Sequence, residues 1–178
     1  MLALVQARRA QLAGQEAARA SDEARQQLAR LKRVTTDLVF RYGDTVSLLP
    51  GGAASQEALL RESVAALEPA LQGAPDDLDL ITTMVAALGR LAEIQGNTTV
   101  ASPRSADDAR ATVDRALALA DRAWPLRFGD WRFASWTVRT LVVQAQGLVA
   151  LGQLEQAAPV LQRAADRAQQ AQGQQHDG

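Results

Sequence analysis

Alanine, leucine and glutamine fill 78 of the 178 positions of this chain, and that bias limits its fold more than any motif does. These side chains lose little rotamer freedom in a helix, so they favour that conformation. A β-sandwich or β-barrel would need many more β-branched and aromatic residues, and only 4% of the residues are aromatic. The composition therefore predicts an all-α protein.

Helix-breaking residues divide the chain into six helical segments joined by short links. An apolar stripe that steps by three or four residues begins at Leu28 and should end before Pro50-Gly51-Gly52. It runs through Leu28, Leu31, Val34 or Thr35, Leu38 and Tyr42. We expect the later helices to span roughly Ser55–Gln72, Asp76 or Asp77 to Gln95, Ser105 to a break at Pro125 and Gly129, Asp130–Leu151, and Leu154–Gln172. Ser55, Asp76 or Asp77, and Ser105 together with Asp108 are the candidate N-terminal caps.

The first 27 residues differ from the rest of the chain. No large apolar side chain occurs between Leu12 and Leu28, so this stretch cannot pack into a core. We expect a polar, juxtamembrane-like helix or stalk over residues 1–27 that adds little to folding stability, a helical repeat domain over residues 28–172, and a disordered tail over residues 173–178. The apolar run from Met1 to Val5 is too short to span a bilayer, and it is either the last turn of a longer membrane helix or an ordinary helix start.

An internal repeat appears in the last two of the three antiparallel hairpins that six helices would form. The pattern A-x3-Φ-x2-A, where Φ is a larger apolar residue, occurs at Ala109, Val113 and Ala116 and again at Ala157, Leu161 and Ala164. Small residues at these spacings let two helices approach closely, while the larger residue fills the gap between them. The pattern favours a tetratricopeptide-like (TPR-like) right-handed superhelix.

Catalytic chemistry has little support in the sequence. The chain has no cysteine, its single histidine is His176 near the C-terminus, and it contains no phosphate-binding loop. Acidic clusters occur at Asp76, Asp77 and Asp79 and at Asp107 and Asp108, but each lies at an expected helix N-terminus, where capping explains it. We therefore expect no catalytic, cofactor-binding or metal-binding residues, and the formal net charge of −1 argues against nucleic acid as a partner.

One family resemblance adds to this interpretation. The segments TVSLLPGGAASQEALLRESVAALEPAL (45–71) and APDDLDLITTMVAALGRLAEIQGN (74–97) resemble the helical repeat regions of bacterial membrane-anchored serine/threonine protein kinases. The likeness extends over roughly residues 1–123, but Ala92-Glu93 and the loop 98–104 depart from the usual pattern. No kinase motif is present, so the resemblance implies the non-catalytic, partner-binding part of a larger signalling protein, with a membrane helix upstream of this chain.

The aromatic residues are concentrated around the fifth expected helix and supply the candidate binding site. Two stripes can be drawn on that helix, and the first, from Trp131 through Val138 and Ala145 to Leu148, is the expected core face. The second contains Phe133, Trp136 and Thr140 with Arg139 beside it, and we hypothesise that these four residues line a groove for a peptide or a partner protein. The alternative, which the scarcity of aromatic residues favours, is that both stripes are buried.

Partner and location follow from the resemblance as expectations. The leading hypothesis is an interaction or scaffold domain that binds a protein or peptide. The alternative is a structural module that forms a homodimer through the N-terminal helix. An unrecognised hydrolase or nucleotide-binding enzyme is a third hypothesis. The resembling kinases imply an extracytoplasmic (periplasmic) location. The basic cluster of Arg8, Arg9, Arg19 and Arg25 argues for the cytoplasmic side instead.

Overall fold

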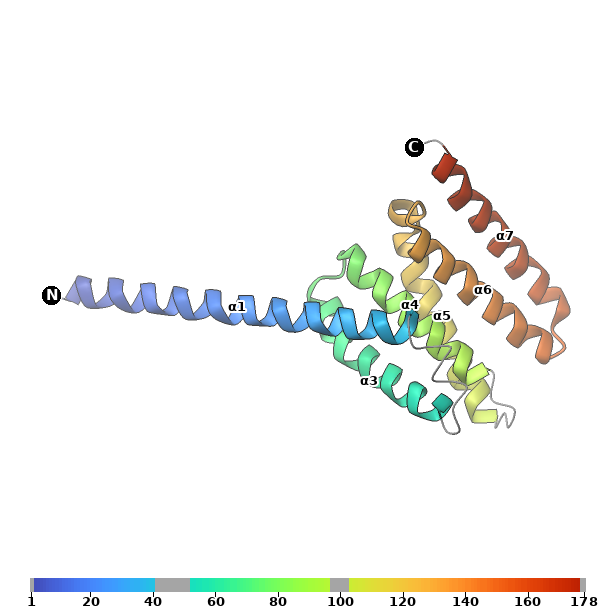
Figure 1. The fold of residues 1–178 in the computed structure, drawn as a ribbon, viewed down its shortest axis with the longest axis horizontal. Coiled ribbons are helices and arrows are strands. Elements are labelled where there is room, and N and C mark those ends of the chain that lie inside the picture. Colours follow the sequence, from blue (N-terminus) through green and yellow to red (C-terminus); the bar gives the residue numbers. More distant parts are fainter. Residues whose placement is uncertain (1, 41–51, 97–102, 177–178) are drawn as a thin grey trace.

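The computed structural model describes residues 2–40, 52–96 and 103–176. Within these ranges the chain forms six α-helices and no β-strand, which confirms the all-α fold (Figure 1). The helices are α1 (Leu2–Phe40), α3 (Gly52–Gly73), α4 (Leu78–Gly96), α5 (Pro103–Arg127), α6 (Trp131–Ala150) and α7 (Leu154–His176).

Helix α1 has an N-terminal half that extends away from the rest of the molecule (Figure 1). All described side chains from Arg8 to Gln27 are exposed, and burial begins at Leu28, where the apolar stripe begins in the sequence. Leu28 and Leu31 pack against the main core, and Thr35 is fully buried whereas Val34 is 60% exposed. Residues 8–27 correspond to about 30 Å of helix. We call residues 8–27 the stalk.

Helix α4 is the centre of the fold. Every residue from Met84 to Gln95 is buried, because α4 is packed against α1, α3, α5 and α6. Its expected inner face is confirmed, since Leu80, Met84, Leu88 and Leu91 are all at most 5% exposed. A helix that is apolar on nearly all sides is the kind that a core can surround.

The other helices pack around α4 as a series of hairpins. The C-terminal part of α1 lies against α3, α4 against α5, and α6 against α7, and the first helix of each hairpin contacts the first helix of the next (Figure 1). Helix α3 contacts α4 and α5 contacts α6, but the backbones of α3 and α5 do not approach each other, nor do those of α5 and α7. Each hairpin therefore touches only its neighbours.

The repeated small residues lie where the sequence predicts, with one exception. Ala109, Val113 and Ala116 of α5 are at most 8% exposed, and Ala157 and Ala164 of α7 at most 4%. Leu161, which should have filled a gap between helices, is instead 47% exposed. The difference has a physical cause: α6 covers the outer side of the hairpin α4–α5, whereas no described helix covers that side of the hairpin α6–α7.

Three expected boundaries are wrong. Helix α3 begins at Gly52, so Ser55 lies inside its first turn and is not the N-cap. Helix α5 begins at Pro103, so Ser105 also lies inside the helix; a proline fits the first turn because its missing N–H would have no helical partner there. Helix α5 also continues through Pro125 to Arg127 before it ends. The expected end of the first helix, at Pro50-Gly51-Gly52, falls mostly outside the described residues.

The C-terminal tail is also shorter than expected. The chain from Gly173 to His176 continues α7 as helix and is not disordered, and residues 177–178 lie outside the described part. Ala171, near this end, is 9% exposed and belongs to the main core, so packing holds the helix up to that turn. A single glycine in a helix costs only about 1 kcal/mol, and the neighbouring alanine and glutamine residues, which favour helix, offset this cost.

The contact between α4 and α6 leaves no room for a side chain at Gly89. A Cβ atom there would lie 2.6 Å from the Thr140 Oγ1 and 3.2 Å from the ring of Trp136. We predict that Gly89→Ala lowers the free energy of unfolding by about 1–2 kcal/mol, because overpacking costs roughly 1–3 kcal/mol and outweighs the higher helix propensity of alanine. Urea unfolding followed by circular dichroism measures the change.

Gly147 in α6 provides the matched control. A Cβ atom at this position would meet nothing within 4 Å. Gly147→Ala should therefore raise the free energy of unfolding by about 0.5–1 kcal/mol. If both variants were stabilised, the close approach of α4 and α6 at Gly89 would be contradicted.

The exposure of the stalk generates a second prediction. Removing residues 1–27 takes away no described side chain that is buried, so the melting temperature should change by no more than about 2 °C. Differential scanning calorimetry of the full and shortened chains tests this. A loss of many degrees would show that the stalk packs against the repeats or against another chain.

Candidate functional site

A groove lies between α3 and α5, above α4, and its volume is about 340 Å³. It exists because α3 and α5 both pack on α4 while their backbones stay apart. Its floor is apolar: Val64, Leu88 and Leu91 are each at most 5% exposed. We call it the α3–α5 groove, and it is lined by Arg61, Val64, Ala65, Glu68, Leu88, Leu91, Gln95, Asp108, Ala111, Thr112 and Arg115.

Two ion pairs cross the rim of the groove from α3 to α5. Arg61 lies 3.5 Å from Asp108, and Arg115 donates a hydrogen bond to Glu68. Arg61 and Glu68 are seven residues apart on α3, and Asp108 and Arg115 are seven apart on α5 with the signs reversed. These side chains are 40–52% exposed, so each pair adds little to stability. The charged side chains at the rim can thus leave these ion pairs and pair with charges of a ligand at a small cost in free energy.

A buried amide closes one end of the groove. Gln95, which is 4% exposed, donates to the Glu57 Oε1 at 3.5 Å, and the Thr112 hydroxyl donates to the Gln95 Oε1 at 2.9 Å. Glu57 also accepts a hydrogen bond of 2.7 Å from Arg61. The end of the groove therefore offers polar groups that are already oriented by one another.

The four residues predicted to line a groove are elsewhere, and for three of them the hypothesis of an open groove is wrong. Phe133, Trp136 and Thr140 are 0%, 5% and 0% exposed because this face of α6 packs against α4 and against Trp124 of α5. Trp131, expected in the core, is 58% exposed at the start of α6. The structure thus buries these three residues, as the alternative interpretation expected, but leaves Trp131 of the first stripe exposed.

Arg139, the fourth predicted residue, does contact charged and aromatic groups. Its side chain is half exposed, donates to the buried carboxylate of Glu93 on α4, and lies 5.0 Å from the centre of the Trp136 ring. Glu93 also accepts a hydrogen bond of 3.0 Å from Arg90, and both of these side chains are only 9% exposed. Two arginines around one buried carboxylate satisfy its charge, so this cluster holds α6 on α4.

The residues that line the groove were missed by the analysis of the sequence. Their signal was present in the seven-residue spacing, which places Arg61 with Glu68, and Asp108 with Arg115, on one side of each helix. That spacing becomes informative only when α3 and α5 are known to form the two walls of one groove. The aromatic residues gave a stronger but misleading signal.

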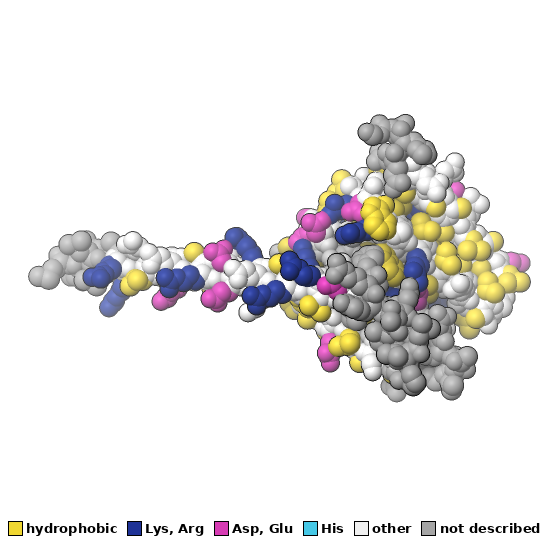
Figure 2. Space-filling view, in the orientation of Figure 1, with side chains coloured by type: hydrophobic (Ala, Val, Ile, Leu, Met, Phe, Trp, Pro, Cys, Tyr) yellow, Lys and Arg dark blue, Asp and Glu magenta, His cyan; other side chains and the backbone are white. Residues whose placement is uncertain are grey.

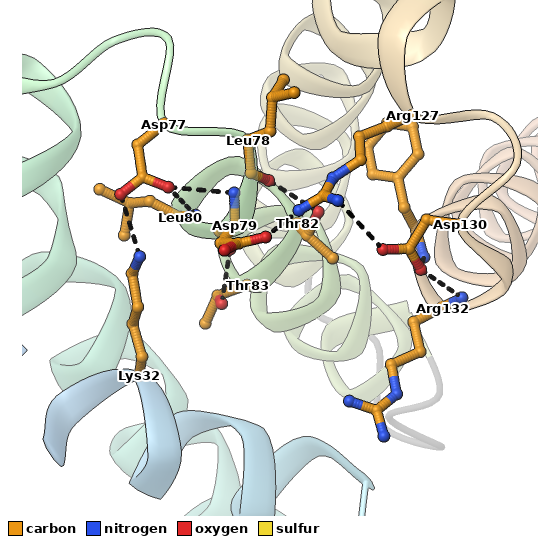
Figure 3. Close-up of polar contacts among 11 residues, drawn as sticks. Lys32, Asp77, Leu78, Asp79, Leu80, Thr82, Thr83, Arg127, Asp130 and Arg132 are labelled. Atoms are coloured by element: carbon orange, nitrogen blue, oxygen red, sulfur yellow. Dashed lines mark hydrogen bonds and ion pairs between the residues drawn. The ribbon is translucent and has the colours of Figure 1, made fainter. Parts of the chain in front are cut away.

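Within the first acidic cluster, Asp77 has the capping role that the sequence predicts (Figure 3). Asp77 caps α4 by accepting hydrogen bonds from the N–H groups of Asp79 and Leu80, and it also pairs with Lys32 of α1 at 3.0 Å. Asp79 pairs with Arg127, whose guanidinium lies 3.7 Å from Asp130, the cap of α6. This chain of contacts joins the C-terminal part of α1 to the start of α4, the end of α5 and the start of α6. No group of three metal-binding side chains occurs among the described residues.

Comparisons with known proteins identify no relative: no family model matches the chain, and neither does any curated protein or any solved structure. None of the helices in the described ranges is long and apolar enough to cross a membrane.

The environment of Asp77 generates a prediction about pH. Burial raises the pKa of the Asp77 carboxyl, but the Leu80 N–H, Lys32 and Arg127 together outweigh this effect and hold that pKa below its ordinary value of 3.8. A lowered pKa in the folded state stabilises the fold above pH 3.8, and this contribution is lost as the pH falls through the folded-state pKa.

We therefore predict that Asp77→Asn, which keeps a capping oxygen, destabilises the protein most at neutral pH. The difference from the wild type should shrink below pH 3.8. Urea unfolding between pH 7 and pH 3 measures it, and Lys32→Met should reduce the difference because the partner charge is gone. A difference that grew as the pH fell would contradict the prediction.

Proposed function

We propose that residues 28–172 form a TPR-like helical-repeat domain that binds a protein or peptide. The observation that carries this proposal is the regular spacing of polar contacts between helices. Between corresponding helices of successive hairpins, the contacts Lys32–Asp77, Arg115–Glu68, Arg139–Glu93, Trp124–Gln170 and Arg167–Asp121 join residues that are 45, 47, 46, 46 and 46 positions apart. Arg163–Asp121, at 42, departs from this spacing. A nearly constant separation is what stacked copies of one structural unit produce.

The unit inferred from these separations is a hairpin of about 47 residues. That is longer than the about 34 residues of a TPR unit. The extra length lies in the helices, since α3, α4, α5 and α6 have 22, 19, 25 and 20 residues. The proposed domain is therefore TPR-like in its order of contacts and has longer helices than the repeat it resembles.

The α3–α5 groove is the proposed partner site. Its apolar floor and its rim charges of both signs suit an amphipathic segment that buries one face and pairs its charges along the edges. The groove lies between the second helices of two successive hairpins, and all its lining residues fall within the segments that resemble kinase repeat regions, or directly after them.

The wider setting is also part of the proposal. From the resemblance, we propose that this domain belongs to a membrane-anchored bacterial signalling protein of the serine/threonine kinase type and lies on its extracytoplasmic side. An exposed, highly charged stalk suits a spacer between such an anchor and the repeats. The function proposed is thus non-catalytic: the domain holds a partner for the protein that carries it.

A selection experiment tests the groove. We expect that random peptides displayed on phage and selected on the full chain yield binders whose affinity, measured by calorimetry, falls at least tenfold in the variant Ala65→Arg/Ala111→Arg. Both alanines are exposed in the groove, so arginine there fills it without disturbing the core.

Ala20→Arg on α1 is the matched control, because Ala20 is also an exposed helical alanine and lies outside the groove. It should leave binding unchanged. Binders that are insensitive to the groove variant would move the partner site elsewhere, and the absence of any binder would count against the proposed function.

A further inference from the structure

The outer side of the last hairpin, α6–α7, is apolar and open (Figure 2). Val149, Leu151, Leu154 and Leu161 are 48%, 61%, 64% and 47% exposed there, and hydrophobic side chains gather at the end of the molecule opposite the stalk. Between the two helices lies a hollow of about 270 Å³, lined by Ala145, Gln146, Val149, Ala150 and Leu161. We call this surface the open end.

The preceding hairpin, α4–α5, shows what covers the corresponding surface there. Helices α4 and α6 both start at a capping aspartate, Asp77 and Asp130. Counted from these caps, Ala145 corresponds to Ala92, and the repeated pattern makes Leu161 correspond to Val113. Ala92 and Val113 are 0% and 3% exposed because α6 covers them with Leu141. The open end is thus the counterpart of a surface that receives a helix.

The charge of the open end identifies the kind of helix it accepts. In the covered counterpart, Glu93 pairs with Arg139 of the arriving helix. Counted from the caps, the residue at that position in α6 is Gln146, which is neutral. No charged side chain lines the hollow, so its occupant needs an apolar, uncharged face.

Helix α7 itself carries a face of that kind. Leu154, Ala158, Leu161 and Ala165 follow one another at helical spacing and are all exposed. The two arginines of α7 are both turned to Asp121 of α5, which leaves Glu155 and Asp166 as the exposed charges among its described side chains. In a two-fold arrangement of antiparallel α7 helices centred on Leu161, Asp166 faces Gln156 of the other copy, so these acidic residues do not oppose each other.

We propose that the open end is a homodimer interface, in which α7 of one copy packs against α6 and α7 of a second copy. An exposed apolar surface of this size marks an interaction site, and a self-complementary face is covered most simply by its own copy. Leu161 lies at the two-fold axis and meets Leu161 of the second copy. This interface is independent of the α3–α5 groove, so the dimer forms whether or not the groove has a partner.

Sedimentation equilibrium of the full chain tests the proposal. We expect a monomer–dimer equilibrium with a dissociation constant on the order of micromolar, as is usual for interfaces of modest size. Leu161→Glu and Leu154→Glu should each weaken it at least tenfold. Leu126→Glu is the matched control, because Leu126 is 73% exposed on α5 and lies outside the open end; it should leave the dimer intact.

A charge-pairing experiment distinguishes this two-fold interface from any other dimer. Leu161→Glu and Leu161→Lys should each be monomeric alone, since like charges meet at the axis, and should form a heterodimer when mixed. A monomer at every concentration would overturn the proposal. A Leu161→Glu variant that dimerises as strongly as the wild type would overturn it as well, because the chains would then associate through another surface, such as the stalk.

Discussion

The close approach of α4 and α6 at Gly89 is the contact on which the rest of the structure depends. Because Gly89 has no side chain, the Trp136 ring and the Thr140 hydroxyl can lie directly against the backbone of α4. That approach in turn brings Arg139 within reach of Glu93 and holds it above the Trp136 ring. One missing side chain thus sets the distance at which two successive hairpins stack, and a buried charge cluster fixes their register.

The helices of this fold pack against one another in two different ways. Between α4 and its neighbours the packing is dense and apolar, whereas α3, α5 and α7 are linked to one another only by side chains that reach across. Glu68 and Arg115 link α3 to α5, and Asp121 with Arg163 and Arg167 links α5 to α7. The Glu68–Arg115 pair is about 40% exposed and holds little free energy, so α3 and α5 can adjust without disturbing the core. Arg167 is only 12% exposed and stacks on Trp124, so it ties α7 to α5 more firmly.

The sequence predicts the helices better than the site because each helix is specified locally. The stripe from Leu80 to Leu91 and the cap at Asp77 each depend on residues within one helix, and both are correct. The errors at Ser55 and Ser105 have a local cause too, since a helix can begin at an earlier glycine or proline.

The groove could not be predicted in this way, because its two walls are about 47 residues apart and neither is unusual by itself. The aromatic cluster misled for a related reason. Tryptophan is a residue type that is common in binding sites, but Trp136 is buried because Gly89 on another helix leaves room for its ring.

The different numbers of neighbours around each helix imply a gradient of local stability along the chain. Helix α4 packs closely against four other helices and α6 against three, whereas the backbone of α7 approaches only that of α6 among the described helices. Amide hydrogens in α4 can exchange with solvent only when most of the domain opens, whereas those of α7 need only one hairpin to separate, and those of the stalk need no tertiary contact to break. The fold is therefore most rigid at its centre and becomes progressively easier to open towards each end of the described chain.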